Sequence, residues 1–234
     1  AKGQYLAFTD SDCTVDKSWL TELLSCFKDP AIAAVGGCQA IPADETKFGK
    51  IVSMFFNSIG FAAEYLRRPQ SQAVFVEHNP TCNAMYKKEI YLQEGGFLKG
   101  LFPGEDVEFD YRLRKKGYKL LFNSNSVVYH YRSRDLKNFS RKMFRYGWVQ
   151  GILVSKYGFF RKFQYFFIAS IALFFFLFLA FCFNIKAGFL LSLALLSILW
   201  IYFLVFSRKF YLAFYFLWNF TVLVFFWNIG FIGG

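Results

Sequence analysis

Two aspartates separated by a single residue, Asp10 and Asp12, come shortly after an apolar run near the start of the chain. The apolar residues 5–8 are predicted to form a short, fully buried strand. Carboxylate oxygens are the ligands that Mg²⁺ and Mn²⁺ prefer, and ligands bind at the carboxyl ends of strands in open α/β sheets. The pair therefore indicates a divalent-cation site that could also hold a diphosphate. The alternative is that both acids cap the helix that follows.

A second acidic cluster opens the segment GEDVEFDYRLRKKGY, residues 104–118. Glu105 and Asp106 are predicted to begin a helix that Gly117 ends, and the helix dipole favours carboxylates in its first turn. One of the two could act as a general base, although helix capping alone would also explain them. Arg112 lies two turns along the helix, where it could orient the acids or form an ordinary surface ion pair.

Strands that alternate with helices must position these residues. We predict strands at residues 5–8, 31–35, 73–76, 118–122 and 127–131, and helices at 19–27, 48–66 and 105–116. The pair Gly36 and Gly37 is expected to end the second strand. This alternation predicts an α/β domain with a largely parallel or mixed sheet.

Charge is distributed unevenly along the 234 residues. The chain carries 27 Lys and Arg against 16 Asp and Glu, and every acidic residue lies before residue 163. The first part is long enough for one domain with its own core, and the part that follows is apolar enough for a membrane. The five cysteines form no CxxC pair and show no metal-ligand spacing, which is typical of thiols in a reducing compartment.

Residues 137–162 mix basic and aromatic side chains and directly precede three apolar runs, at 163–183, 187–206 and 210–232. We interpret the basic segment as an amphipathic helix in the membrane interface, rather than as a solvated face, and the runs as about three transmembrane helices. Basic residues gather before the first run and between the second and third. The positive-inside rule then predicts a multi-pass cell-membrane protein whose polar domain is cytoplasmic.

The excess of basic residues does not predict nucleic-acid binding. The charge is densest beside the apolar runs, and no nucleic-acid-binding motif is recognisable, so anionic lipid or diphosphate partners explain it better. A transporter is disfavoured too, because the apolar runs contain no acidic residue for an ion pathway.

Five segments within residues 1–150 together resemble the membrane-associated family 2 glycosyltransferases. In order they are GQYLAFTDSDC, NPTCNAMYKKEIYLQEGGF, GEDVEFDYRLRKKGYKLLF, VVYHYRSR and MFRYGW. The resemblance implies a GT-A fold, an α/β fold with a mixed sheet flanked by helices, and an inverting transfer of a hexosyl group from a UDP- or GDP-sugar. The first residues look like the tail of an earlier helix, so we expect residues 1–136 to be the C-terminal portion of the catalytic domain. The interface helix 137–162 and the membrane region 163–234 would follow.

The resemblance also assigns chemical roles to the two acidic clusters. Asp10 and Asp12 match the motif that contacts the donor's diphosphate through Mg²⁺ or Mn²⁺, and His130 could join this metal site. Asp106 matches the acid that acts as the base, with Glu105 in support.

Other polar residues are assigned less firmly. Asn83 matches a loop near the donor sugar, where the family often has Gly at the position of Cys82. A packed or solvent-facing side chain is the alternative for His130, whereas His78, next to the Asn-Pro pair that follows it, is expected to be a turn residue.

Processive relatives carry a QxxRW signature, for which this chain has Lys142, Arg145 and Tyr146. Arg145 is expected to bind the donor's diphosphate, and Tyr146 and Arg112 to support the acceptor site. Lys in place of Gln disfavours processive polymerisation. We therefore expect transfer of one sugar to a lipid-linked or saccharide acceptor at the cytoplasmic membrane face, in polysaccharide or glycolipid biosynthesis of the cell envelope. A processive polysaccharide synthase and a non-catalytic membrane scaffold with a degenerate transferase domain are the alternatives.

Overall fold

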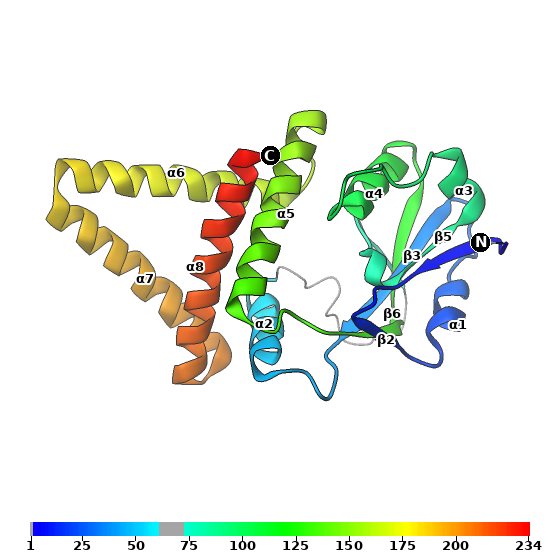
Figure 1. The fold of residues 1–234 in the computed structure, drawn as a ribbon, viewed down its shortest axis with the longest axis horizontal. Coiled ribbons are helices and arrows are strands. Elements are labelled where there is room, and N and C mark those ends of the chain that lie inside the picture. Colours follow the sequence, from blue (N-terminus) through cyan, green and yellow to red (C-terminus); the bar gives the residue numbers. More distant parts are fainter. Residues whose placement is uncertain (1, 61–72) are drawn as a thin grey trace. The chain divides into compact units, whose positions relative to one another are not determined.

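The computed structural model describes residues 2–60 and 73–234 (Figure 1). The chain divides into two compact units, Ala1–Arg132 and Ser133–Gly234. The first unit is built on a sheet and the second on helices, and each is described by itself below.

Six strands form the sheet of the first unit within the described residues, and they confirm the expected α/β class with a mixed sheet flanked by helices. The main path runs β1-β5-β3-β6-β2, and β4 pairs with β6. Only β3 and β6 are parallel among these pairs. The strands are β1 (Tyr5–Phe8), β2 (Cys13–Val15), β3 (Ile32–Ala40), β4 (Val74–Phe75), β5 (Ala84–Lys87) and β6 (Lys119–His130).

The strand expected to be fully buried, β1, is only partly buried. It lies at one end of the strand order and pairs with β5 alone among the described residues, so one of its edges and much of its surface stay open. The prediction was wrong because a short apolar run does not reveal whether its strand lies in the middle or at the edge of a sheet.

The Gly36–Gly37 pair does not end its strand, because β3 continues to Ala40. A Cβ atom on Gly36 would lie 2.3 Å from Oδ1 of Asn79, and one on Gly37 would lie 2.1 Å from the carbonyl oxygen of Ser126. These glycines therefore allow other backbone segments to approach the strand closely instead of breaking it. Similarly, the two strands expected at 118–122 and 127–131 form the single strand β6, with a register shift opposite Gly37 and Cys38.

Helices cover both faces of this sheet. Phe109 and Leu113 of α4 pack with Tyr86 on one face, whereas Trp19 and Leu23 of α1 pack on the other face in a second cluster. Each fully buried side chain of this size stabilises the fold by about 2–3 kcal/mol. The helical elements of the unit are α1 (Trp19–Leu24), α2 (Lys47–Ser58), the 3-10 turn η1 (Thr81–Asn83), α3 (Lys88–Gln93) and α4 (Glu105–Lys115).

The helix expected at 48–66 begins as predicted, since α2 covers Lys47–Ser58 and Thr46 caps its first turn. The part of this prediction beyond residue 60 lies outside the described residues until residue 73. The helix expected at 105–116 is α4, and Gly117 follows it with a φ of 88°, a conformation that favours glycine.

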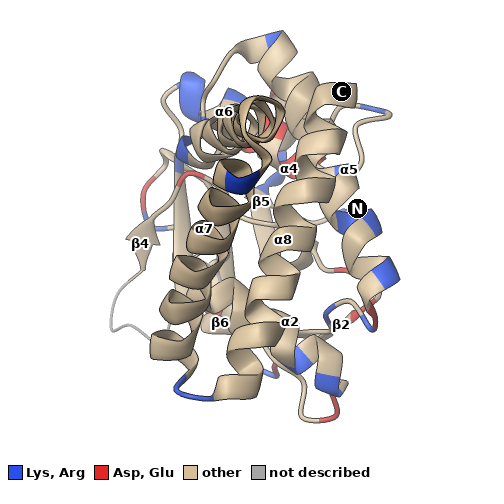
Figure 2. Ribbon diagram, turned by 90° about the vertical axis from the view of Figure 1, so that its left-hand side faces the viewer, with Lys and Arg blue, Asp and Glu red and all other residues tan. Residues whose placement is uncertain are grey.

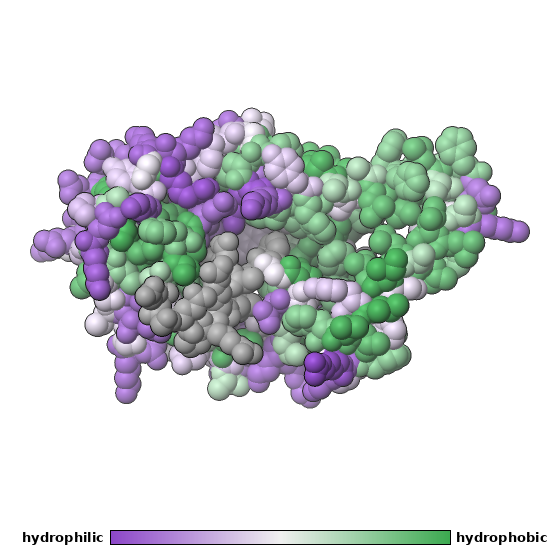
Figure 3. Space-filling model, turned by 180° about the vertical axis from the view of Figure 1, so that it is seen from behind, coloured by the Kyte–Doolittle hydropathy of each residue, from purple (hydrophilic) through white to green (hydrophobic). Residues whose placement is uncertain are grey.

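The second unit consists of four long helices within the described residues: α5 (Leu136–Tyr157), α6 (Lys162–Phe183), α7 (Ile185–Ser207) and α8 (Phe210–Gly233). The last three are long and apolar enough to cross a membrane, as expected. Figure 2 shows α7 and α8 without charge along most of their length, with basic residues in the loop that joins them. The face of this unit seen in Figure 3 is mostly hydrophobic.

The helix α5 packs closely along α8. A Cβ atom on Gly147 would lie 2.0 Å from the carbonyl oxygen of Trp227, and one on Gly230 would lie 2.1 Å from that of Phe144. A glycine on each helix leaves no side chain at the contact, so the two helix backbones can approach closely, as they do in membrane helix pairs. The helix predicted at 137–162 therefore packs along α8, a contact that the sequence alone did not indicate. The helix also ends at Tyr157, before Gly158, and not at residue 162.

Candidate active site

The metal-binding set expected from the sequence comes together at the end of β1. Backbone pairing between β2 and β6 places Cys13 opposite His130, so the imidazole lies beside the turn that carries the aspartates. Nε2 of His130 lies 3.6 Å from Oδ1 of Asp12. Asp10, Asp12 and His130 offer ligand atoms that all lie within 4.8 Å of one another. Two carboxylates and one imidazole suit Mn²⁺ or Mg²⁺.

The hydrogen bonds around His130 decide which of its nitrogens can bind a cation. Oε1 of Gln39 accepts a hydrogen bond from Nη1 of Arg132 at 3.3 Å, and it lies 3.0 Å from Nδ1 of His130. Because this oxygen is an acceptor, Nδ1 of a neutral imidazole must carry the proton. The lone pair then lies on Nε2, the nitrogen that faces Asp12, and metal-binding histidines are usually oriented by such an outer hydrogen bond.

The acids of α4 are positioned by the start of their helix. Gly104 precedes the helix with a φ of 106°, a left-handed conformation that suits glycine. Oδ1 of Asp106 accepts the N–H of Val107 at 2.8 Å, and Oδ2 accepts the N–H of Thr81 at 3.2 Å. Burial and the neighbouring Asp106 raise the pKa of Glu105 to about 7. Glu105 can therefore take up or lose a proton near neutral pH.

The turn η1 joins the two acidic clusters. Thr81 donates its backbone N–H to Asp106 and its hydroxyl, at 3.4 Å, to Glu105. The thiol sulfur of the next residue, Cys82, lies within 4.8 Å of that of Cys13, which follows Asp12 directly. The two constellations found in the sequence are thus parts of one site.

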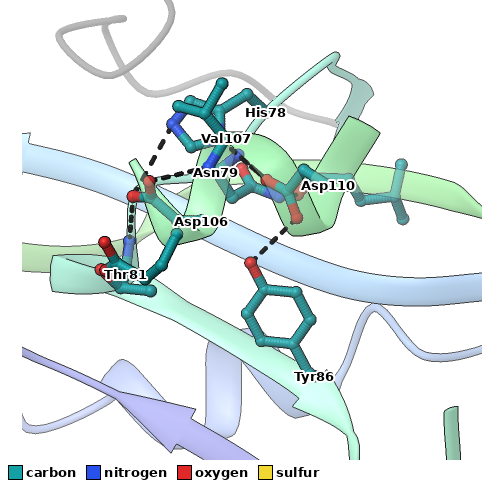
Figure 4. A network of polar contacts seen from close by, with 9 residues as sticks. His78, Asn79, Thr81, Tyr86, Asp106, Val107 and Asp110 are labelled. Carbon is teal, nitrogen blue, oxygen red and sulfur yellow. Dashed lines mark hydrogen bonds and ion pairs between the residues drawn. The ribbon is translucent and has the colours of Figure 1, made fainter. Parts of the chain in front are cut away.

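A buried network that sequence reasoning missed lies behind Asp106 (Figure 4). Nδ1 of His78 lies 2.8 Å from Oδ2 of Asp110, and Nε2 lies 3.8 Å from Oδ2 of Asp106. Asp110 also accepts the hydroxyl of Tyr86 at 2.9 Å and the N–H of Asn79 at 2.8 Å. The expectation of an ordinary turn residue at His78 is wrong, because the side chain is buried between two carboxylates.

One signal in the sequence could have found half of this network. Asp106 and Asp110 stand four residues apart on one helix, and side chains at that spacing share a helix face. Their partner His78 lies in a distant loop, so its place follows only from the packing of that loop on α4. The same burial, together with Asp110, raises the pKa of Tyr86 well above its usual value.

Asn83 is fully buried, and its amide is engaged inside the domain. Its oxygen accepts the indole N–H of Trp19 at 2.8 Å, and its nitrogen donates to the carbonyl oxygens of Cys38 and Ser126 at 2.9 and 3.0 Å. The side chain therefore ties η1 to the sheet. Contact with a donor sugar, as expected from the family pattern, would require these bonds to be exchanged.

Among the described contacts, Arg112 is bonded to neither Glu105 nor Asp106, and its ion pair is with a buried acid. Its Nε donates to the buried Glu108 at 2.8 Å, and its terminal nitrogens donate to the carbonyl oxygens of Glu94 and Gly96. It therefore holds the turn after α3. Arg145 and Tyr146 lie on α5 in the second unit, and their roles remain predictions.

Comparison with known proteins identifies the family of this chain. The chain matches the sequence profile described as "Glycosyl transferase family group 2" over residues 5–229. It is 26% identical over 144 residues to "Pre-mycofactocin glycosyltransferase" of two strains of Mycobacterium tuberculosis, CDC 1551 / Oshkosh and ATCC 25618 / H37Rv. Those matches cover 61% of this chain and 30% of the relatives, so the chain spans about a third of their length.

A solved structure, "Crystal structure of GalNAc-T7 with UDP, GalNAc and Mn2+", is similar to part of the chain. Its TM-score is 0.41 at 19% sequence identity, and the match covers 64% of this chain and 34% of that one.

Proposed function

The chain belongs to glycosyl transferase family group 2, and from that premise we propose that it transfers a hexosyl group from a nucleotide-diphosphate sugar to an acceptor hydroxyl with inversion. The observation that carries this proposal is the position of the turn η1 between the two acidic clusters. Thr81 of this turn is hydrogen-bonded to the acids of α4, and the thiol of Cys82 lies within 4.8 Å of that of Cys13, which follows Asp10 and Asp12. A cation-binding edge and a candidate base thus lie on either side of one turn, as a transfer between a diphosphate and a hydroxyl requires.

The donor set at the end of β1 fits the divalent cation that the family implies. Asp10, Asp12 and His130 would hold Mn²⁺ or Mg²⁺, with Nε2 of the histidine as the nitrogen ligand. When bound, such a cation offsets the negative charge that develops on a departing diphosphate. Both aspartates are exposed, so a UDP- or GDP-sugar could reach them from solvent.

The acids of α4 would handle the proton of the acceptor. A hydroxyl is a poor nucleophile at neutral pH, and a carboxylate that accepts its proton raises the rate about 10²- to 10⁴-fold. We assign this role to Asp106, whose two oxygens are oriented by the backbone of Thr81 and Val107. Glu105 would support it by supplying negative charge when ionised. A single displacement of this kind inverts the anomeric carbon.

The acceptor is proposed from the second unit. Three helices that could cross a membrane favour a lipid-linked or saccharide acceptor at the membrane, in polysaccharide or glycolipid synthesis of the cell envelope. Basic residues between the second and third helices favour a cytoplasmic catalytic domain. With three spans the C-terminus lies outside, so a C-terminal reporter that is active only in the cytoplasm should give no signal. A signal from it would contradict this topology.

A donor screen in membranes that contain the protein tests the proposal. Labelled UDP- and GDP-hexoses are offered with Mn²⁺ or Mg²⁺, and transfer to lipid or saccharide is measured with and without EDTA. We expect transfer from one donor, loss with EDTA, and loss in Asp106→Asn. Glu89→Gln is the matched control, because Glu89 is an exposed acid in the first turn of α3.

The same screen separates the alternatives. Products with one added sugar support the proposal, whereas long polymers would indicate a processive synthase. No transfer from any donor, with membrane lipids present, would favour the scaffold and contradict the proposed reaction.

A further inference from the structure

A cluster of soft ligands overlaps the hard-ligand set at the end of β1. The thiols of Cys13 and Cys82 and one ring nitrogen of His130 lie within 4.8 Å of one another. Their elements are β2, η1 and β6, so the cluster exists only in the folded protein. We propose that Cys13, Cys82 and His130 bind a thiophilic divalent cation such as Zn²⁺, and that this cation excludes Mn²⁺ or Mg²⁺ from the neighbouring site.

The spacing of the three ligands is close to what zinc needs. A tetrahedral Zn²⁺ with Zn–S bonds of about 2.3 Å holds its sulfur atoms about 3.8 Å apart. Ligand atoms within 4.8 Å of one another therefore need to move by about 1 Å or less. Two thiolates and one imidazole form a known zinc ligand set, and the fourth position stays open for water or another oxygen ligand. On binding, each thiol releases its proton to the solvent.

The surroundings of His130 already prepare it as a ligand. Its Nδ1–H donates to Gln39, and Gln39 is itself held by Arg132, so Nε2 is the nitrogen whose lone pair is available to a cation. Cys82 and His130 are 3% and 6% exposed, so two of the three ligands lie in the wall of the site and not on a mobile surface. A hydrogen bond of this kind to a metal-binding histidine typically strengthens metal binding about 10- to 100-fold.

Exclusion of the second cation follows from the shared histidine. Nε2 of His130 also faces Asp12 at 3.6 Å, and one lone pair cannot bind two cations. Zinc binds a given nitrogen or sulfur ligand more tightly than Mn²⁺ does, and Mg²⁺ prefers oxygen ligands, so zinc should win this competition at equal concentration. Zinc would also link the turn of Asp12 to η1, whose Thr81 orients Asp106. The binding is independent of the proposed function, whereas inhibition of transfer by zinc rests on it.

The simpler explanation is that the two thiols only fill space. Two neighbouring thiols can pack against each other as small apolar groups without a metal. A spectroscopic probe separates the two explanations, because packing thiols give no metal-dependent absorption.

Cobalt titration of the purified protein in detergent, with a non-thiol reductant, tests the binding. Co²⁺ replaces Zn²⁺ in tetrahedral sites, and bound thiolates give a charge-transfer band in the near ultraviolet. We expect this band at one equivalent of Co²⁺ and its loss when Zn²⁺ is added. Cys13→Ser and Cys82→Ser should each halve the band, the double variant should abolish it, and the control Cys26→Ser should keep it. No band in the wild type, or a band that survives in the double variant, would overturn the proposal.

Two measurements complete the test. On the wild type alone, Zn²⁺ should slow alkylation of Cys13 by iodoacetamide at least about 10-fold, as a coordinated thiolate is shielded, and should leave the half-buried Cys26 unchanged. Equal alkylation rates would count against the site. In Mn²⁺ titrations followed by electron paramagnetic resonance, one equivalent of Zn²⁺ should release bound Mn²⁺ from the wild type but not from the double variant. Retention of Mn²⁺ by the wild type would refute the overlap.

The outcomes distinguish this inference from the proposed function. A protein with the cobalt band but without sugar transfer would refute the transferase and leave the zinc site standing. A protein that transfers sugar but shows no cobalt band would support the transferase and refute the zinc site.

Discussion

The cation-binding cluster at the end of β1 and the buried network behind Asp106 hold their charges in opposite ways. Asp12, beside β1, has 52% of its side chain exposed, whereas Asp110 of α4 is fully buried and His78 is 7% exposed. Exposed carboxylates can exchange water for a cation at little cost, whereas a buried carboxylate must be hydrogen-bonded to keep its charge. The first cluster is thus suited to bind and release a charged ligand, and the second to hold one carboxylate in a fixed orientation.

The difference also predicts how each cluster responds to substitution. Changes at the exposed edge should alter cation affinity and leave folding intact. Changes in the buried network should alter the rate, the stability, or both. The four predictions below follow this division, beginning with the largest expected effect.

Asp106→Asn should reduce transfer about 10³-fold, because the amide cannot accept the proton of the acceptor hydroxyl. Mn²⁺-dependent binding of the nucleotide should be unchanged, since the cation site lies in the other cluster. Single-turnover transfer and calorimetric nucleotide binding, measured on the same preparation, check both halves. Near-normal turnover would refute the assignment of Asp106 as the base.

Asp12→Asn should weaken Mn²⁺ binding by at least about 10-fold, because it removes one charged ligand. The thermal unfolding midpoint should stay within about 2 °C of the wild type, since an exposed side chain is replaced by one of the same shape. Mn²⁺ titration and a melting curve without metal are the two measurements. A large loss of stability with normal Mn²⁺ affinity would reverse the division between the clusters.

His78→Ala should lower the rate constant of transfer about 10-fold and destabilise the fold by about 1–3 kcal/mol, because it leaves Asp110 buried with one hydrogen bond fewer. His78→Asn separates the two effects. The asparagine amide can replace Nδ1 as the donor to Asp110, but it puts nothing beside Asp106. We expect it to restore stability and not the rate, and full recovery of the rate would show that His78 acts only through folding.

Glu105→Gln should have the smallest effect on stability and on the transfer rate, and both effects should depend on pH. The pKa of Glu105 is about 7 in the folded protein against an ordinary 4.5. Between these values the folded protein keeps a proton that the unfolded chain has lost, so stability falls as the pH rises through this window. The variant should therefore melt about 2 °C above the wild type at pH 8, and at the same temperature at pH 4, with the effect limited by partial exposure.

The transfer rate should also depend on the ionisation of Glu105. Wild-type transfer should rise as the pH passes about 7, because ionised Glu105 favours proton transfer to its neighbour, and this inflection should be absent from Glu105→Gln. An identical pH profile in both proteins would show that Glu105 has no part in the reaction.

Much of the fold was predictable because its signals are local. The helix α4 could be read from the acids in its first turn and from Gly117 after its end, and the three long apolar helices from their length and composition. The strands were harder to predict from the sequence. The predictions failed at β1, at the Gly36–Gly37 pair and at the long strand β6, because edge position and close backbone approach depend on elements that are distant in the sequence.

The two acidic motifs, the α/β order of elements and the apolar helices could all be recognised in the sequence, because each depends on residue types at short, regular spacing. The fold is needed to place His78 between Asp106 and Asp110, and to bring Cys13 and Cys82, which show no metal-ligand spacing in the sequence, close to His130. The register of β2 on β6 and the seating of η1 against β3 bring these residues together. Both are fixed by packing across the whole sheet, which no local pattern records.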